Sequence, residues 1–456
     1  MKDITMKRQF ERPFIRKIKA GVPSKFGMAV HSDPVTHIDN VPVDELTVNY
    51  GSPLFVVSEK TIRDTFAEAK SAFETRYPKV RFAWSYKTNY LDAVCRIYHS
   101  EGSWAEVVSG FEYEKAIRNG VKGSEIIFNG PDKSDEDLQT AVENDSLIHI
   151  DHFDELYSLS SICRKSGKKA RVAIRVNMDT GVYPMWDRFG FNYENGDAWD
   201  AINRIMLDDN MVFTGLHTHI GTFMLTAEAY RIAASKLCDL AVRTQKKHGK
   251  AVSYIDMGGG FASRNTLKGA YWQGKDTVPT FDDYAEAITS AIINSDIPPE
   301  NMPILILETG RALIDDAGFL IGTVLANKRL SDGRRSTIVD TGVNILFTSF
   351  WYDHEFHPAK ETSDHLEETT MYGPLCMNID VVRDAIAFPL LKKGDRFVVK
   401  RIGAYNMTQW MQFITYRPNV VLIDISGKTH LVRKAETLET VTSAEVVPSH
   451  LKTVVK

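Results

Sequence analysis

The stretch VRFAWSYKTNYLDAVCRIYHSEGSWAEVV, residues 80–108, contains the alternation that decides the fold. A nearly continuous apolar run at 80–86 is followed by a helical pattern and then by a second apolar run at 103–108. Short apolar runs of this kind are typical of strands that are covered on both faces. A helix between two such strands is typical of a parallel sheet, so the stretch predicts one unit of an α/β domain.

The same alternation continues along the chain to residue 308. The strand-like runs are Val80–Tyr86, Ser103–Val108, Ile126–Asn129, Leu147–Asp151, Arg171–Val176, Phe213–His219, Tyr254–Met257 and Ile304–Glu308. Eight strand–helix units are the number that closes a (β/α)8 barrel, which is the fold we predict. An open, doubly wound parallel sheet is the alternative that this pattern leaves open.

Helix signals between the runs agree with this prediction. A helical pattern at 111–119 ends at Gly120, and another at 153–165 ends near Gly167, as expected of glycines that follow a helix. Ser134 precedes three acidic residues, which is typical of a helix N-cap. These positions place helices where crossover connections are required.

The second half of the chain has a different character. Strand-like runs with turn residues occupy 335–353, 395–405 and 418–433, which predicts a separate, mostly antiparallel β domain. The segment Ser52–Glu59 also resembles a strand and could pair with that domain. We therefore expect three regions, which are an arm and strand at 1–57, a barrel at 58–325 and a β domain at 326–456.

Composition excludes several classes of protein. The chain has 456 residues, with 43% apolar residues, 25% charged residues and a net charge of -4, so neither a disordered protein nor a nucleic-acid-binding protein is expected. No apolar run approaches the roughly 18 residues of a membrane span. The basic N-terminus lacks the apolar core of a secretion signal and is predicted to be a solvated arm.

The four cysteines are scattered and form no CxxC pair. This pattern is typical of proteins in a reducing compartment, and it predicts no metal site. We therefore expect a cytoplasmic protein with a small-molecule substrate.

Polar residues stand at the carboxyl ends of most predicted strands, where barrels carry their function. They are Lys87, Glu106, Asn129, Gly130, Arg175, Asn177, His217, His219, Gly258, Gly259, Gly260, Glu308, Gly310 and Arg311. The three glycines and Arg311 follow strands seven and eight, where barrels often bind phosphate. A tight turn is the plain alternative for the glycines.

Lys87 and Glu308 suggest which phosphate is bound. A lysine in a barrel mouth can be desolvated, which lowers its pKa and makes it a Schiff-base nucleophile. A lysine beside a phosphate site indicates pyridoxal phosphate or a phosphosugar aldolase. A carboxylate such as Glu308 near a pyridine nitrogen keeps that ring protonated, and His219 could lie on the ring face.

Seven motifs occur in an order that we recognise, namely SYKTN, GLHTHIGT, DMGGGF, LETGR, VDTGVN, GPLC and GAY. Together they resemble the fold-type III pyridoxal-phosphate decarboxylases, the group that contains diaminopimelate, ornithine and arginine decarboxylases. The resemblance extends over about Ser52 to Ile425, and EVVSGFE, IIFNGPDKSDEDL and RFGFN are most similar to the diaminopimelate branch. It implies an alanine racemase-like fold and a pyridoxal 5'-phosphate cofactor.

The resemblance also implies residue roles. Lys87 carries the cofactor as a Schiff base, His219 stacks on its ring, Glu308 pairs with the pyridine nitrogen and Arg175 lies near the phenolic edge. Cys376 donates a proton after CO2 leaves, and in the family it reaches the site from the other subunit of a homodimer. The residues that would hold the phosphate are Thr222, Gly258, Gly259, Gly260, Gly310, Arg311 and Tyr405, and Thr309 is a further cofactor-binding residue.

Two positions depart from the diaminopimelate branch. Met377 follows Cys376 where that branch has an acid for the distal amino group, and Thr348 stands near the place of its carboxylate-binding arginine. Because an unpartnered carboxylate or ammonium is costly to bury, meso-diaminopimelate is disfavoured. Asp353 lies in a YDH motif that resembles ornithine-type enzymes, where the aspartate faces a terminal amine. The predicted substrate-side residues are Arg311, Tyr352, Asp353 and Met377, for a basic side chain or a larger amine conjugate.

Three alternatives remain at this point. The first is an amino-acid racemase on the same barrel, although racemases of this kind pair the pyridine nitrogen with arginine. The second is a non-catalytic pyridoxal-phosphate carrier, although carriers of this fold lack an additional β domain. The third is a lysine aldolase that uses no cofactor.

Overall fold

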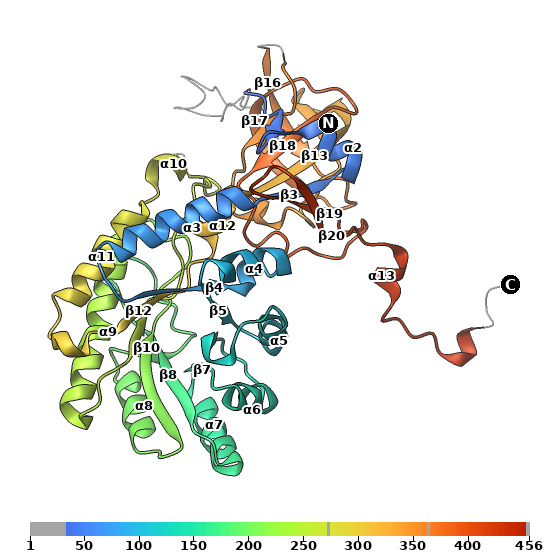
Figure 1. Cartoon of the computed structure of the whole chain (residues 1–456). Coiled ribbons are helices and arrows are strands. Elements are labelled where there is room, and N and C mark those ends of the chain that lie inside the picture. The colour runs from blue at the N-terminus through green and yellow to red at the C-terminus, as the bar shows by residue number, and fades with distance from the viewer. Residues whose placement is uncertain (1–32, 271–273, 363–364, 453–456) are drawn as a thin grey trace, which may run out of the picture.

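The computed structural model describes residues 33–270, 274–362 and 365–452. These residues form a barrel and a second body built on a mixed sheet, which lie one above the other in Figure 1. The basic arm predicted at the N-terminus lies outside the described residues.

The barrel is a closed sheet in which every neighbouring pair of strands is parallel. Its strands are β4 (Val80–Ser85), β5 (Trp104–Val107), β6 (Ile126–Phe128), β7 (Leu147–Ile150), β8 (Ala170–Asn177), β10 (Met211–His217), β11 (Tyr254–Asp256) and β12 (Ile304–Leu307). Pairing between β8 and β10 joins the two halves, while β12 pairs with β4. The predicted (β/α)8 barrel is therefore confirmed, and the open sheet is excluded.

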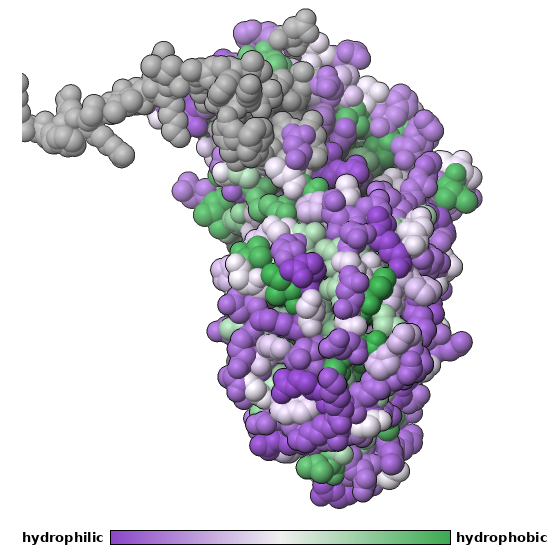
Figure 2. All heavy atoms as spheres, turned by 90° about the vertical axis from the view of Figure 1, so that its left-hand side faces the viewer, coloured by the Kyte–Doolittle hydropathy of each residue, from purple (hydrophilic) through white to green (hydrophobic). Residues whose placement is uncertain are grey.

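Helices surround this sheet on the outside (Figure 1). They are α3 (Glu59–Glu74), α4 (Asp92–Ser100), α5 (Gly110–Arg118), α6 (Asp135–Glu143), α7 (Phe153–Ser166), α8 (Asp197–Met206), α9 (Ala227–His248) and α11 (Phe281–Ile293). The predicted caps are present, since the Ser134 side chain accepts a hydrogen bond from the Asp137 backbone and Gly167 ends α7 with φ of 69°. Hydrophilic side chains predominate on the side where α9 and α11 lie (Figure 2), as expected of a solvated outer face.

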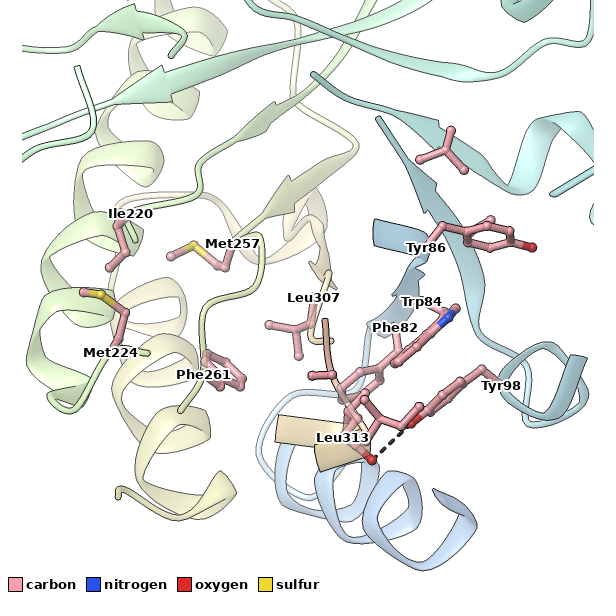
Figure 3. Packing of buried hydrophobic residues seen from close by; sticks show 14 of the residues in the cluster. Phe82, Trp84, Tyr86, Tyr98, Ile220, Met224, Met257, Phe261, Leu307 and Leu313 are labelled. Carbon is pink, nitrogen blue, oxygen red and sulfur yellow. Dashed lines mark hydrogen bonds between the residues drawn. The ribbon is translucent and has the colours of Figure 1, made fainter. Parts of the chain in front are cut away.

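Apolar side chains fill the space between strands and helices and continue to the rim (Figure 3). Trp84 on β4 stacks on Tyr98 of α4, with ring centroids 3.8 Å apart. The Tyr98 hydroxyl donates to the carbonyl oxygen of Leu313 over 3.0 Å. Leu313 belongs to the short helix α12 (Arg311–Ile314), so the core fixes the helix that carries Arg311.

The second sheet combines the two ends of the described chain. Its strands are β3 (Leu54–Ser58), β13 (Gly318–Arg329), β14 (Arg335–Val339), β15 (Phe356–Pro358), β16 (Leu366–Tyr372), β17 (Val381–Pro389), β18 (Arg396–Lys400), β19 (Asn419–Ile423) and β20 (Thr429–Arg433). Most pairs are antiparallel, while β3–β19 and β14–β16 are parallel. The predicted pairing of Ser52–Glu59 with this sheet is confirmed, because β3 lies between β13 and β19.

The remaining elements are short. They are β1 (His37–Ile38), β2 (Val41–Pro42), α2 (Val43–Tyr50), β9 (Phe191–Asn192), α10 (Gly274–Thr277) and α13 (Leu438–Thr442). Helix α13 projects away from the rest of the molecule (Figure 1).

Two details differ from the sequence-based expectation. The run 335–353 is a strand only as far as Val339, because backbone hydrogen bonds within 342–352 close local turns instead of pairing with a strand. The expected boundary at 325/326 falls inside β13, whose partners all belong to the second sheet. We therefore propose that the barrel region ends before Gly318.

Replacing Phe55 by alanine is expected to lower the free energy of unfolding by about 3–5 kcal/mol. Phe55 on β3 is fully buried, and its ring packs edge-on against Trp410 with centroids 5.6 Å apart. Val48→Ala on α2 is the control, because Val48 is 83% exposed. Urea unfolding followed by tryptophan fluorescence measures both effects. Equal transition midpoints for the two variants would contradict this role of β3.

Candidate functional site

A cavity of about 880 Å³ opens at the rim formed by the carboxyl ends of the barrel strands. A small recess adjoins it beside the glycine loop that follows β11. The predicted site residues that line one or both of these spaces are Lys87, Arg175, His219, Thr222, Gly259, Gly260, Glu308, Gly310, Arg311, Tyr352 and Tyr405. The fold thus brings together residues that are more than 300 positions apart in sequence.

Lys87 lies against a carboxylate in the wall of this cavity. It follows β4 directly, and its Nζ donates to both carboxylate oxygens of Glu106 on β5, at 2.6 and 2.8 Å. Burial opposes the charge on Lys87, but the carboxylates of Glu106 and Glu308 outweigh it and raise the pKa of Lys87 above its ordinary value. The expectation of a lowered pKa was therefore wrong, because the sequence did not show that two carboxylates face this lysine.

Glu308 follows β12 and faces side chains that end or follow other strands of the barrel, β6 and β10. Asn129 Nδ2 donates to Glu308 Oε1 over 2.5 Å, and His217 Nε2 lies 3.4 Å from Oε2. Asp256, which ends β11, is fully buried and accepts the backbone N–H of Gly258 over 2.8 Å. Burial and the negative charge of Glu308 raise the pKa of the Asp256 carboxyl well above its ordinary value, which favours the protonated form of Asp256.

His219 presents an uncharged ring to the cavity. Burial and the positive charges of Arg175 and Lys87 keep the pKa of His219 well below its ordinary value. The backbone N–H of Gly259 donates to its Nδ1 over 3.0 Å, which leaves the proton of the neutral ring on Nε2. A neutral, fixed imidazole can lie flat against an electron-poor ring without adding charge.

The recess beside the glycine loop has the properties of a phosphate site. A Cβ on Gly258 would lie 2.5 Å from the Thr218 carbonyl oxygen, and one on Gly259 would lie 2.6 Å from that of Glu308, so only glycine allows this close approach. Arg311 begins α12 beside the recess, and its guanidinium lies over the Tyr405 ring, 4.6 Å from the centroid.

Unpaired buried groups support the same assignment. Among the described residues, Arg311 Nη1, Thr309 Oγ1 and Thr88 Oγ1 are buried without a hydrogen-bond partner. Such groups are costly to bury unless a ligand binds them. A guanidinium, hydroxyl groups and a glycine loop are the donors that a phosphate monoester requires, so these residues fit one.

Aromatic side chains form the outer part of the cavity, and the sequence analysis did not identify most of them. They are Tyr183, Trp186, Phe189, Phe223, Phe350, Trp351 and Tyr352. Three of them lie in the loop after β8, where the run VYPMWDRF was an available signal because barrel loops carry specificity. Asp256 was also missed, since its importance depends on its contact with Glu308.

Four residues that the sequence singled out lie outside the cavity and the recess. Cys376 is exposed in the connection between β16 and β17, and Met377 lines a separate small cavity with Asp380. Asp353 forms an ion pair with Arg383 and does not line the main cavity. Thr348 is fully buried, where its hydroxyl bonds to His354 and Asn406.

Among the described helices, none combines the length and apolar character needed to cross a membrane.

The family described as pyridoxal-dependent decarboxylase, pyridoxal binding domain, matches residues 60–315. The diaminopimelate decarboxylase of Methanocaldococcus jannaschii is 28% identical over 91% of this chain and 95% of its own length. That of Bacillus subtilis is also 28% identical, over 90% of this chain and 95% of its own.

The solved structures give the same result. The crystal structure of the Methanocaldococcus jannaschii diaminopimelate decarboxylase covers 91% of this chain and 96% of its own, with a TM-score of 0.83 and 27% identity. Its complex with L-lysine has a TM-score of 0.84 and 26% identity, over 93% of this chain and 99% of its own. The matched domain covers more than half of the chain, which therefore belongs to the pyridoxal-dependent decarboxylases and is a pyridoxal-phosphate-dependent amino-acid carboxy-lyase.

Proposed function

We propose that Lys87 and Cys376 are the two groups that react in this decarboxylation, with Cys376 supplied by a second copy of the chain. The observation that supports this most directly is the position of Lys87 between the phosphate recess and the open cavity. When bound, pyridoxal phosphate supplies an electron sink for the electron pair that CO2 leaves behind. The residues proposed to hold it are Lys87, Arg175, His219, Thr222, Gly258, Gly259, Gly260, Glu308, Thr309, Gly310, Arg311 and Tyr405.

Lys87 would hold the cofactor covalently through Nζ. Glu106 has both oxygens within 2.8 Å of that nitrogen, so it is placed to hold a proton that Lys87 releases. Asn129 Nδ2 also donates to Glu106, over 3.1 Å, which keeps the carboxylate oriented towards Lys87. Proton transfer over such distances needs no intervening water.

Glu308 and His219 would set the charge and the orientation of the cofactor ring. Glu308 offers a carboxylate that accepts a hydrogen bond from Asn129, while burial and the charge of Glu308 raise the pKa of Asp256 beside it. An acceptor with this charge favours the protonated form of a nearby ring nitrogen. His219 is neutral and fixed by Gly259, so it supports the ring by contact rather than by charge.

The position of Cys376 supports a homodimer with shared active sites. Cys376 is exposed and does not line the cavity of its own chain. Its loop is nevertheless rigidly held, because buried Asp380 accepts the backbone N–H groups of Val343 and Leu375 over 2.8 and 2.7 Å. Exposed Ile379 in the same loop offers apolar surface for association.

We further propose that the substrate is an amino acid with a long side chain that ends in an amine or an amine conjugate. Met377 and Thr348 supply neither an acid nor a cation for diaminopimelate, and Asp353 is already paired with Arg383.

We propose action in the cytoplasm, which is supported by the free state of all four cysteines and by the need to keep Cys376 reduced. The comparisons give no support to a racemase or to a carrier without activity.

Lys87→Ala is expected to lose the covalent cofactor, because no other described lysine lines both the cavity and the phosphate recess. Borohydride reduction followed by mass spectrometry of peptides locates the adduct, and we expect it on Lys87 in the unaltered protein. Lys70→Ala on α3, where the side chain is 45% exposed, is the control and should retain the adduct. An adduct that persists on another lysine of the Lys87→Ala protein would show that the assignment is wrong.

Cys376→Ala is expected to reduce decarboxylation about 10²–10⁴-fold, which is the usual contribution of a general acid. The visible absorbance of bound cofactor should be unchanged. Cys163→Ala, at a buried position on α7, should keep nearly full activity. Unchanged turnover by Cys376→Ala would refute its role as proton donor.

Mixing two inactive variants tests whether the site is shared. A dimer of one Lys87→Ala chain and one Cys376→Ala chain contains one site with both groups intact, so random mixing should restore about a quarter of the activity in a twofold symmetric dimer. If Cys376 acted within its own chain, each site in the mixed dimer would lack one group. Failure to recover activity would therefore exclude shared sites.

A further inference from the structure

Charged side chains are distributed unevenly over the cavity. Among the described lining residues, the carboxylates are Glu106 and Glu308, and both lie at the inner end, where they contact Lys87 and Asn129. The outer part is aromatic and apolar, with Lys268 as a charged side chain near Trp351. Among the described residues that line the cavity, Lys268 is therefore the charged group near this wall, and Asp384, which contacts its ammonium, does not itself line the cavity.

The loop that carries Cys376 would add no free acid if it entered the cavity from a second copy. The loop that carries Cys376 continues with Met377, Asn378 and Ile379, none of which is acidic. Asp380, the next residue, is buried and engaged with the backbone of Val343 and Leu375. A free distal ammonium would thus enter an aromatic cavity without a carboxylate partner, which costs free energy.

Lys268 is held at the cavity by its backbone and keeps donors available. Its backbone N–H donates to the carbonyl oxygen of Trp351 over 2.7 Å. Its Nζ lies 3.1 Å from Asp384 Oδ2, and the Asp384 side chain is 60% exposed. An exposed pair of this kind contributes little free energy. An ammonium carries three N–H donors, so a second carboxylate can bind beside Asp384.

We infer that the substrate carries its distal nitrogen as an amide whose acyl group ends in a carboxylate, and that Lys268 binds this carboxylate. This inference rests on the proposed decarboxylation. The cavity of about 880 Å³ accommodates such a conjugate. Trp186, Phe350 and Trp351 contact its methylene groups and the face of its amide, and Gln409 offers a hydrogen-bonding group near the outer end.

Three substrates with the same amino-acid part test the inference on the holoenzyme. They are L-ornithine, its Nδ-acetyl derivative and its Nδ-succinyl derivative, which end in an ammonium, a neutral group and a carboxylate. Release of CO2 gives kcat/KM for each. We expect the succinyl derivative to be the best substrate and ornithine the poorest.

Lys268→Gln is expected to lower kcat/KM for the succinyl derivative about 10–100-fold, as for loss of a charged hydrogen bond. Its effect on the acetyl derivative should be less than about threefold, since that group makes no ion pair. Lys165→Gln, at an exposed position on α7, is the control and should change neither value.

Each result decides a separate question. If ornithine were the best substrate, or if Lys268→Gln lowered all three values equally, the inference about the acyl carboxylate would be overturned and the decarboxylase proposal would remain. If none of the three substrates released CO2 from protein with bound cofactor, the proposed reaction at this site would fail, and the inference would fail with it.

Discussion

Pairing between β8 and β10 is the constraint on which the rest of the molecule depends. In this pair His217 is in register with Arg175 and Leu216 with Ile174, and the closure turns an open parallel sheet into a ring. Parallel strands present their carboxyl ends on one side, so the ring gathers side chains from the whole barrel around one opening. Lys87 from the first strand and Glu308 from the last thereby face the same cavity.

Closure also forces ionisable groups into a small, poorly solvated volume. Lys87, Glu106, Glu308 and Asp256 stay together because each finds an opposite charge, an amide donor or a proton. Isolated charges in such a place would be unstable. The arrangement leaves two carboxylates, Glu106 and Glu308, lining the cavity, and a buried carboxyl, Asp256, whose pKa is raised.

Local patterns were sufficient to predict the barrel and the inner site. Each of the eight predicted runs lies within about two residues of an observed strand, because both faces of a barrel strand are buried and the apolar run is continuous. The glycines and Arg311 were identified because they follow strands directly. The resemblance to a decarboxylase family added Cys376, which no pattern of spacing indicated.

Features that depend on contacts between distant segments were not predicted. The pKa of Lys87 depends on Glu106 and Glu308, which come from other strands. Asp353 looked available for a substrate amine because Arg383, its partner, lies on a strand of the second sheet. The aromatic wall combines the loop after β8 with Phe350 and Trp351, which the sequence pattern had assigned to a strand.

The position of β3 has a consequence for the order in which the chain folds. Its residues, Leu54–Ser58, are all buried between β13 and β19, and the partner segment of β19 is Asn419–Ile423. A ribosome that has completed the barrel has made neither β13 nor β19, so the apolar strand β3 then lacks both of its neighbours. Unpaired apolar strands promote aggregation. The nascent chain must therefore be protected at this segment, by a chaperone or by transient contacts, until nearly all of it has been synthesised.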